Sequence, residues 1–130
     1  MLQRLRSSVG AHGIRDVMDA KGVATMAWGY LVFAGLLEIG WPVGLKMAQA
    51  GTHRLLGVLI AIAFMVASGV FLWLAQRDIP LGTSYAVWTG IGAAGTFAYG
   101  IAVYGDPTNI GRLLGVGLIV AGVATLKLSH

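Results

Sequence analysis

The sequence predicts an all-α membrane protein with four transmembrane helices. Of its 130 residues, 57% are hydrophobic and only 11% are charged, and the mean hydropathy is +0.79. A soluble domain of this length would need far more polar surface to cover its core. The apolar residues gather in four stretches separated by short polar turns, and each stretch approaches the roughly 20 residues with which a helix crosses a bilayer.

Other features of the sequence argue against several classes of protein. Cysteine is absent, which excludes disulfides and thiolate metal sites. The net charge of +4 is not arranged as a basic stripe with interleaved aromatics, so we expect no nucleic-acid partner. The sequence has no nucleophile–base pair, phosphate-binding loop or ligand-spaced cluster, and its histidines lie in the N-terminal tail, in a turn and at the C-terminus. We therefore expect no enzyme activity, no metal and no cofactor.

Residues 1–25 form a polar extension ahead of the first apolar stretch. They lack the apolar centre of a signal peptide, and Asp16 and Asp19 argue against a transit peptide. Either the extension is a disordered tail, or translation begins at Met26, which leads directly into the first span. We favour the later start, with residues 26–130 as a four-helix transmembrane domain.

The first span, from about Trp28 to Leu45, carries the only charge near the middle of an apolar stretch, Glu38. A charged side chain at the centre of a spanning helix costs about 2.5–3.5 kcal/mol on insertion scales. A short chain carries this cost only if the carboxylate binds a cation, moves a proton, or does both. The functional interpretation of the sequence therefore rests on Glu38.

On a helix, Glu38 shares a face with Trp41 one turn later and with two small residues one turn earlier, Ala34 and Gly35. The small residues leave room, and the indole of Trp41 adds an aromatic wall. A carboxylate beside an aromatic ring suits a planar or quaternary organic cation. Pro42 has no N–H to donate to the Glu38 carbonyl, so it either frees that acceptor for a ligand or simply kinks the helix.

The second span, from about Leu55 to Ala75, contributes Ser68, which is either a small packing residue or a hydrogen-bond partner that orients Glu38. The third span, from about Leu81 to Tyr104, places aromatic, hydroxyl and small residues on one helical face: Tyr85, Trp88, Thr89 and Gly92. Aromatic residues near the end of a span are usually interfacial anchors, but the interleaved hydroxyls and glycines favour the wall of a cavity. Three glycines also weaken this helix, so we expect it to bend near Gly90, Gly92 and Gly95.

The fourth span, from about Ile110 to Leu128, has a short apolar centre bracketed by Arg112 and Lys127, whose side chains can snorkel to the interfaces. One face combines glycines with aliphatic residues at spacings that let helices approach closely, and we expect it to form a dimer interface: Gly115, Leu118, Ile119 and Gly122. Four short helices do not easily enclose a pathway, whereas two copies in opposite orientations would surround a site at the midplane.

The basic residues at the ends of the spans bear on orientation. Without residues 1–25, Arg77 and Lys127 face one side of the membrane, and Lys46, Arg54 and Arg112 face the other. Such a balance leaves almost no positive-inside bias and is what a dual-topology protein requires. With the extension, the first side gains four more basic residues, and one orientation should dominate.

These residues resemble the small multidrug resistance transporters over essentially all of residues 26–130. The resemblance rests on Gly35-Leu36-Leu37-Glu38 followed by Trp41 and Leu45-Lys46, on the run IPLGTSYAVWTGIG at residues 79–92, and on the glycine-bearing fourth span. The tryptophan three residues after the glutamate, and the run WTGIG at residues 88–92, look like the guanidinium-exporter subtype more than the broad multidrug subtype. Pro42 and the N-terminal extension depart from the family pattern.

The resemblance implies an antiparallel homodimer in the bacterial cytoplasmic membrane that exchanges protons for a small cation by alternating access. Glu38 would be the shared proton and substrate site, completed by residues that orient it or line its pocket: Trp41, Ser68, Tyr85 and Trp88. The bend at Gly90 and Gly92 would let the third span move, and the fourth span would hold the dimer.

Three functions stay open at this point. The first, which we favour, is proton-coupled export of guanidinium or small guanidinyl cations, because a proton and a cation can compete for one carboxylate. The second is broad-specificity export of quaternary ammonium and other multidrug cations. The third is a membrane partner subunit that does not transport.

Overall fold

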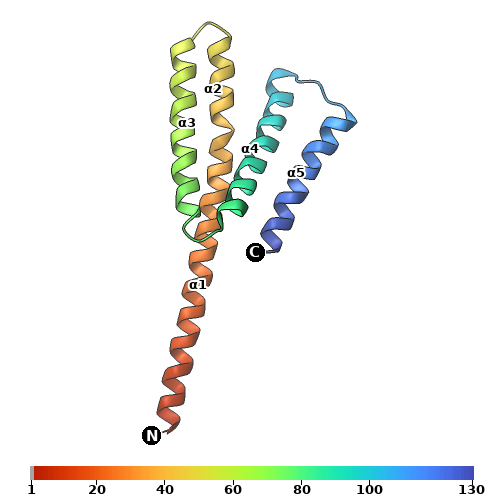
Figure 1. The fold of residues 1–130 in the computed structure, drawn as a ribbon. Coiled ribbons are helices and arrows are strands. Elements are labelled where there is room, and N and C mark those ends of the chain that lie inside the picture. Colours follow the sequence, from red (N-terminus) through yellow and green to blue (C-terminus); the bar gives the residue numbers. More distant parts are fainter. Residues whose placement is uncertain (1) are drawn as a thin grey trace.

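The structure, a computed structural model, describes the backbone of residues 2–130 and the side chains of residues 13–130. The chain forms five helices, α1 (Leu2–Glu38), α2 (Gly40–Gln49), α3 (Arg54–Ala75), α4 (Leu81–Tyr104) and α5 (Ile110–Leu128) (Figure 1). With α1 and α2 taken together, four segments are long and apolar enough to cross a membrane: Gly13–Gln49, Arg54–Ala75, Leu81–Tyr104 and Ile110–Leu128. The prediction of a helical chain with four spans is confirmed.

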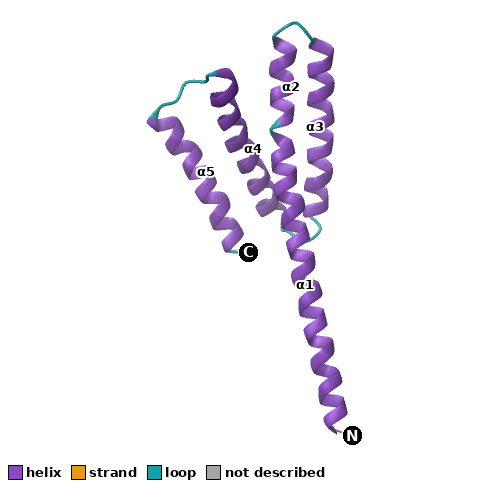
Figure 2. Cartoon of the chain, turned by 180° about the vertical axis from the view of Figure 1, so that it is seen from behind, coloured by secondary structure: helices purple, strands orange, loops and turns teal. Residues whose placement is uncertain are grey.

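α1 and α2 are two parts of one span, interrupted at Ile39 (Figure 2). The N–H of Ile39 donates to the Leu36 carbonyl at 3.3 Å, three residues back instead of four. Pro42 accounts for an interruption at this point, because its missing N–H leaves the Glu38 carbonyl without its helical donor. Glu38 therefore ends α1, and its neighbours Trp41 and Pro42 belong to α2.

α1 continues well beyond the bundle, away from the α2–α3 turn (Figure 1). Its apolar side chains in this part, such as Ile14 and Met18, are exposed. In the structure this part of the chain is helical from Leu2 onward. A helix extended from an existing span needs no new nucleus, which favours this continuation. The start of translation at Met26 stays a prediction.

The four spans are arranged with α2 and α3 side by side, α4 against α1, and α5 at the edge beside α4 (Figure 1). The α2–α3 turn and the α4–α5 loop lie at the same end of the bundle. Gly105 ends α4 in the left-handed conformation, with a φ of 66°. Asn109 then caps α5, because its side chain accepts a hydrogen bond from the Arg112 N–H at 2.9 Å.

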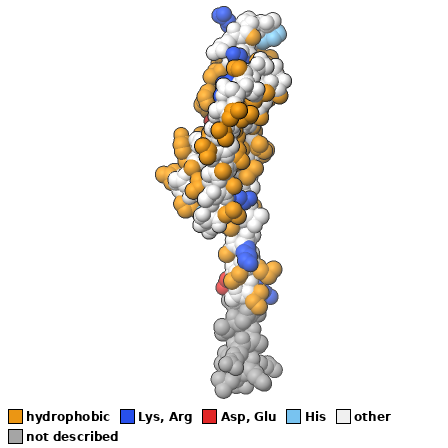
Figure 3. Space-filling model, turned by 90° about the vertical axis from the view of Figure 1, so that its right-hand side faces the viewer, with side chains coloured by type: hydrophobic (Ala, Val, Ile, Leu, Met, Phe, Trp, Pro, Cys, Tyr) orange, Lys and Arg blue, Asp and Glu red, His pale blue; other side chains and the backbone are white. Residues whose placement is uncertain are grey.

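The buried core is small, and most large apolar side chains point outward. Figure 3 shows hydrophobic side chains over the middle of one face of the molecule. In a bilayer these side chains contact lipid, so the helices associate by close packing and hydrogen bonds instead of by excluding water. The core cluster consists of five buried residues: Ala27, Leu31, Ala75, Ile79 and Val87.

Two glycines bring the backbones of α2 and α3 into direct contact. A Cβ at Gly44 would lie 2.7 Å from the Gly57 carbonyl oxygen, and a Cβ at Gly57 would lie 2.5 Å from the Ala48 nitrogen. Both neighbours are backbone atoms, which cannot rotate away as a side chain does. This contact holds α3, and with it Ser68, close to the first span.

Replacing Gly57 with alanine should therefore destabilise the bundle. The added methyl group would push α2 and α3 apart, and overpacking of this kind costs about 1–3 kcal/mol. We expect a lower midpoint of thermal unfolding in detergent, measured by tryptophan fluorescence. Gly69→Ala is the matched control, because Gly69 lies on the same helix with nothing within 4 Å of an added Cβ. An equal decrease in both variants would contradict the role of the contact.

Candidate cation-binding site

The carboxyl group of Glu38 faces a cleft between α2 and α4. The cleft has a volume of about 310 Å³. Glu38 itself is half-buried at the end of α1, next to the interruption between α1 and α2. The residues that line the cleft come from the first span and from α4: Glu38, Trp41, Pro42, Thr89, Gly92, Ala93 and Thr96.

Each oxygen of the Glu38 carboxylate accepts a hydrogen bond from a different helix. The indole Nε1 of Trp41 on α2 donates to Oε1 at 2.6 Å. The hydroxyl of Ser68 on α3 donates to Oε2 at 2.9 Å. Hydrogen bonds to an ionised acceptor are short and stronger than those between neutral groups. The pair of donors therefore compensates part of the hydration that the carboxylate loses in the membrane.

Ser68 connects Glu38 to a second tryptophan. Its side chain is fully buried, and its oxygen accepts a hydrogen bond from the Trp88 Nε1 at 2.8 Å. The same hydroxyl lies 2.9 Å from the Ala34 carbonyl. A hydroxyl has one proton, so Ser68 shares it between this carbonyl and Glu38. Ser68 is thus hydrogen-bonded to Glu38 and does not serve only as a small packing residue.

The ring of Tyr85 contacts the ring of Trp88. Their ring centroids lie 5.2 Å apart with an interplanar angle of 56°. Tyr85 is 55% exposed and is not among the residues that line the Glu38 cleft. The structure thus joins four predicted site residues in one hydrogen-bonded chain and leaves Tyr85 at its outer edge. What each contributes to binding stays a prediction.

The glycines of α4 let the neighbouring helices approach it. A Cβ at Gly92 would lie 2.6 Å from the Glu38 Cγ, so the side chain of Glu38 packs directly on the α4 backbone. Gly90 packs in the same way against Val123 of α5. α4 is one continuous helix through both positions. The expected bend near Gly90, Gly92 and Gly95 stays a prediction.

Sequence reasoning missed part of the cleft wall. Thr96 lies on the same side of α4 as Thr89 and Gly92, one turn farther on, and the helical period could have included it. Nothing in the sequence predicts the contact of the Ala34 carbonyl with Ser68, because this contact depends on how α3 is rotated about its axis.

Thr89 offers an acceptor to a ligand in the cleft. Its hydroxyl donates its proton to the Tyr85 carbonyl at 2.8 Å, so only the lone pairs of the hydroxyl oxygen are available to a ligand.

The residues expected at a dimer interface lie on α5, none of whose residues is buried. Leu118, Ile119 and Gly122 line a groove of about 380 Å³ that also includes Thr89 and Gly90 of α4. Nothing lies within 4 Å of a Cβ built at Gly115 or Gly122. The face thus borders a groove open on one side.

The chemistry of the site is that of an acceptor for cations. Trp41 and Ser68 donate to the carboxylate, Trp88 donates to Ser68, and no basic side chain lines the cleft. Among residues 13–130, no group of three or more histidines, aspartates or glutamates is placed to hold a metal ion. The arrangement therefore suits a proton or a small organic cation.

Fold and site together define a small multi-pass membrane protein with a carboxylate held inside its spans. Residues 26–119 match the family described as Small Multidrug Resistance protein, and the chain belongs to this family. It is 48% identical over 104 residues to a protein of Yersinia pseudotuberculosis named "Guanidinium exporter", which covers 80% of this chain and 99% of the relative. Relatives of the same name from Citrobacter freundii and Proteus vulgaris are 50% and 49% identical over 104 residues, again 80% of this chain, and 98% and 99% of their own lengths.

These relatives are named as exporters within a transporter family. The prediction that the chain is not an enzyme is confirmed by this membership. The recognition of the family from the run at residues 79–92 and from the surroundings of Glu38 is confirmed as well.

Replacing Ser68 with alanine should destabilise the bundle more than the same change at Ser84. Ser68→Ala leaves the Trp88 Nε1 and one Glu38 oxygen without their partner, and an unsatisfied buried polar group costs about 1–3 kcal/mol. Ser84 is equally buried, but its hydroxyl donates only to the Leu81 carbonyl of its own helix, at 3.0 Å. Thermal unfolding in detergent compares the two variants. A smaller loss in Ser68→Ala than in Ser84→Ala would contradict the hydrogen-bonded chain.

Proposed function

We propose that the protein is a proton-coupled antiporter that exports guanidinium or small guanidinyl cations across the cytoplasmic membrane, with Glu38 as the shared site. The observation that carries this proposal is the Glu38 carboxylate, held by one donor on each oxygen at the side of a cleft within the spans. The name that the relatives bear supports guanidinium as the cargo.

The two donors leave the carboxylate able to bind a planar cation. Each carboxylate oxygen has about two acceptor positions, and Trp41 and Ser68 occupy one on each oxygen. Guanidinium presents parallel N–H groups that match such a fork, and it is weakly hydrated, so it is transferred from water at less cost than an ammonium ion. Thr89 adds a hydroxyl acceptor in the same cleft.

Proton coupling follows from the single charge. A proton or a guanidinium ion neutralises the Glu38 carboxylate, and neutralisation removes the main cost of holding it within the membrane. The two cations therefore exclude one another from the same carboxylate. Protons entering from outside would release the cargo there, and loss of the protons inside would allow reloading.

The working unit in this proposal is an antiparallel homodimer with one Glu38 from each copy. Supporting observations are the absence of buried residues on α5 and the open groove beside Leu118, Ile119 and Gly122. The near balance of basic residues at the two ends of residues 26–130 suits insertion in both orientations. A bend of α4 at Gly90 and Gly92 would then open the site to alternate sides.

Replacing Glu38 with glutamine should abolish coupled transport. Glutamine keeps the size of the side chain but neither binds a proton nor offers a charge to guanidinium. In proteoliposomes with a pH-sensitive dye inside, we expect a guanidinium gradient to move protons with the wild-type protein and not with Glu38→Gln. Asp78→Asn is the matched control, because Asp78 is an exposed carboxylate in the α3–α4 turn, outside the spans.

Robust guanidinium-driven proton movement in Glu38→Gln would overturn the proposed mechanism. Wild-type protein that responds to tetraalkylammonium but not to guanidinium would favour the broader quaternary ammonium exporter. Wild-type protein that is silent with both cations, in the full-length form and when started at Met26, would favour a partner subunit that does not transport.

A further inference from the structure

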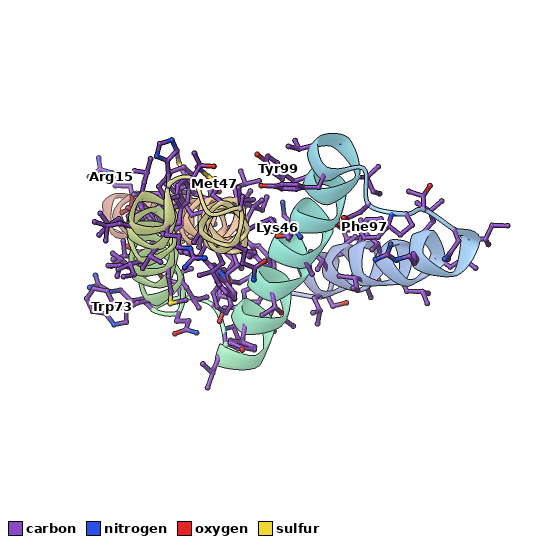
Figure 4. All side chains as sticks on the ribbon, turned by 90° about the horizontal axis from the view of Figure 1, so that it is seen from above. Arg15, Lys46, Met47, Trp73, Phe97 and Tyr99 are labelled. Carbon is purple, nitrogen blue, oxygen red and sulfur yellow. The ribbon has the colours of Figure 1, made fainter. Side chains whose placement is uncertain are left out.

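A second pocket lies between α2 and α4, toward the end of the bundle that carries the α4–α5 loop. Its volume is about 200 Å³. Figure 4 shows Lys46 and Tyr99 in the space between the two helices. The lining combines aromatic rings with one basic and one acidic side chain, and comes from α2, α4 and the loop: Pro42, Val43, Lys46, Thr96, Tyr99, Gly100, Tyr104 and Asp106.

The pocket already holds a cation, supplied by the chain itself. The ammonium of Lys46 lies 5.7 Å from the ring centroid of Tyr104, within the range of cation–π attraction. Tyr99 and Tyr104 have ring centroids 6.1 Å apart, so two aromatic rings border the same space. An ammonium group in this position indicates that the pocket suits a positive charge.

Asp106 supplies the matching negative charge. Its N–H donates to the Gly100 carbonyl at 3.1 Å, after Gly105 has turned the chain back with its positive φ. Its carboxylate oxygen Oδ2 lies in the space that a Cβ at residue 100 would fill. Gly100 therefore allows this carboxylate to lie against α4 and to face the pocket.

The second pocket adjoins the Glu38 cleft. Pro42 and Thr96 line both, one from each side of the space between α2 and α4. Lys46 is the only basic side chain in the linings of the two pockets. A cation that leaves Glu38 along this space therefore meets one basic side chain, that of Lys46. The pocket therefore lies between the Glu38 cleft and the end of the bundle that carries the α4–α5 loop.

We propose that this pocket is a second, outer station for the transported cation, in which Asp106 and Tyr104 bind the cation after it displaces the Lys46 ammonium. The inference rests on the proposed function, since it assumes that a cation travels to or from Glu38. Lys46 acts as a tethered competitor, and its exposed, flexible side chain can swing into water when the cation enters. Asp106 raises the local concentration of cations beside the cleft.

The proposal predicts opposite changes for the two charged residues. In proteoliposomes containing the full chain, Asp106→Asn should raise the KM for guanidinium about 2- to 5-fold, the range expected for a weak, partly exposed cation contact. Lys46→Met keeps the aliphatic stem but removes the competitor, and should lower the KM. The ratio of protons to guanidinium should not change in either variant, because Glu38 is intact.

Two control variants separate the pocket from the general charge of the surface. Arg54→Gln removes a positive charge from the same end of the bundle, and Asp78→Asn removes a negative charge from the other end; neither residue lines the pocket. A decrease in KM with Arg54→Gln equal to that with Lys46→Met would assign the effect to the surface field and overturn the proposal. An unchanged KM in both Asp106→Asn and Lys46→Met, with active wild-type protein, would also overturn it. Wild-type protein that moves no guanidinium would overturn the proposed function itself, and the outer station with it.

Discussion

A carboxylate inside a membrane-spanning helix is stable only where polar groups replace the water that it has lost, and Glu38 is the only acidic residue within the predicted spans. Its two oxygens draw donors from α2 and α3, and Ser68 in turn accepts from Trp88 on α4. One side chain thus requires three other helical segments to meet at one place. The hydrophobic core is small, and the hydrogen bonds that join Trp41, Glu38, Ser68 and Trp88 help to align the helices.

Close backbone contacts make that meeting feasible. Gly44 and Gly57 bring α3 near enough for the Ser68 hydroxyl to reach both the Ala34 carbonyl and Glu38. On the opposite side, α4 presents Gly92 to the Glu38 side chain. The glycines are therefore part of the site in a mechanical sense, although none of them offers a group to a ligand. They set the distances at which the polar side chains act.

The sequence was sufficient for features that depend on local rules. Bilayer thickness determines how long an apolar stretch must be, so hydropathy predicted the second, third and fourth spans almost to their observed ends. The first span was predicted from about Trp28, whereas the spanning segment in the structure runs over Gly13–Gln49. The helical period placed Trp41 beside Glu38, because three residues of spacing correspond to about one turn.

Features that depend on how one helix is rotated against another were harder to predict from the sequence. The contacts of Trp88 with Ser68 and of Ile119 with Gly90 have no local signal, whereas the helical period of α4 could have included Thr96 in the cleft wall. The interrupted helix at Ile39 was foreseeable from Pro42, whereas the helical course of residues 2–25 was not.

The wall that faces the Glu38 side chain at residue 92 is bare backbone, with no side chain left to remove. Every substitution at this position adds atoms to the space beside the carboxylate, so in the proposed mechanism such a change would narrow the range of cations that fit. Acquisition of bulkier cargo would have to proceed through residues that still have volume to lose, above all Trp41 and Trp88. Both indoles also hold the carboxylate, directly or through Ser68. In the proposed mechanism a broader substrate range and a well-positioned Glu38 are therefore in conflict, and a wider range would require other groups to hold the carboxylate.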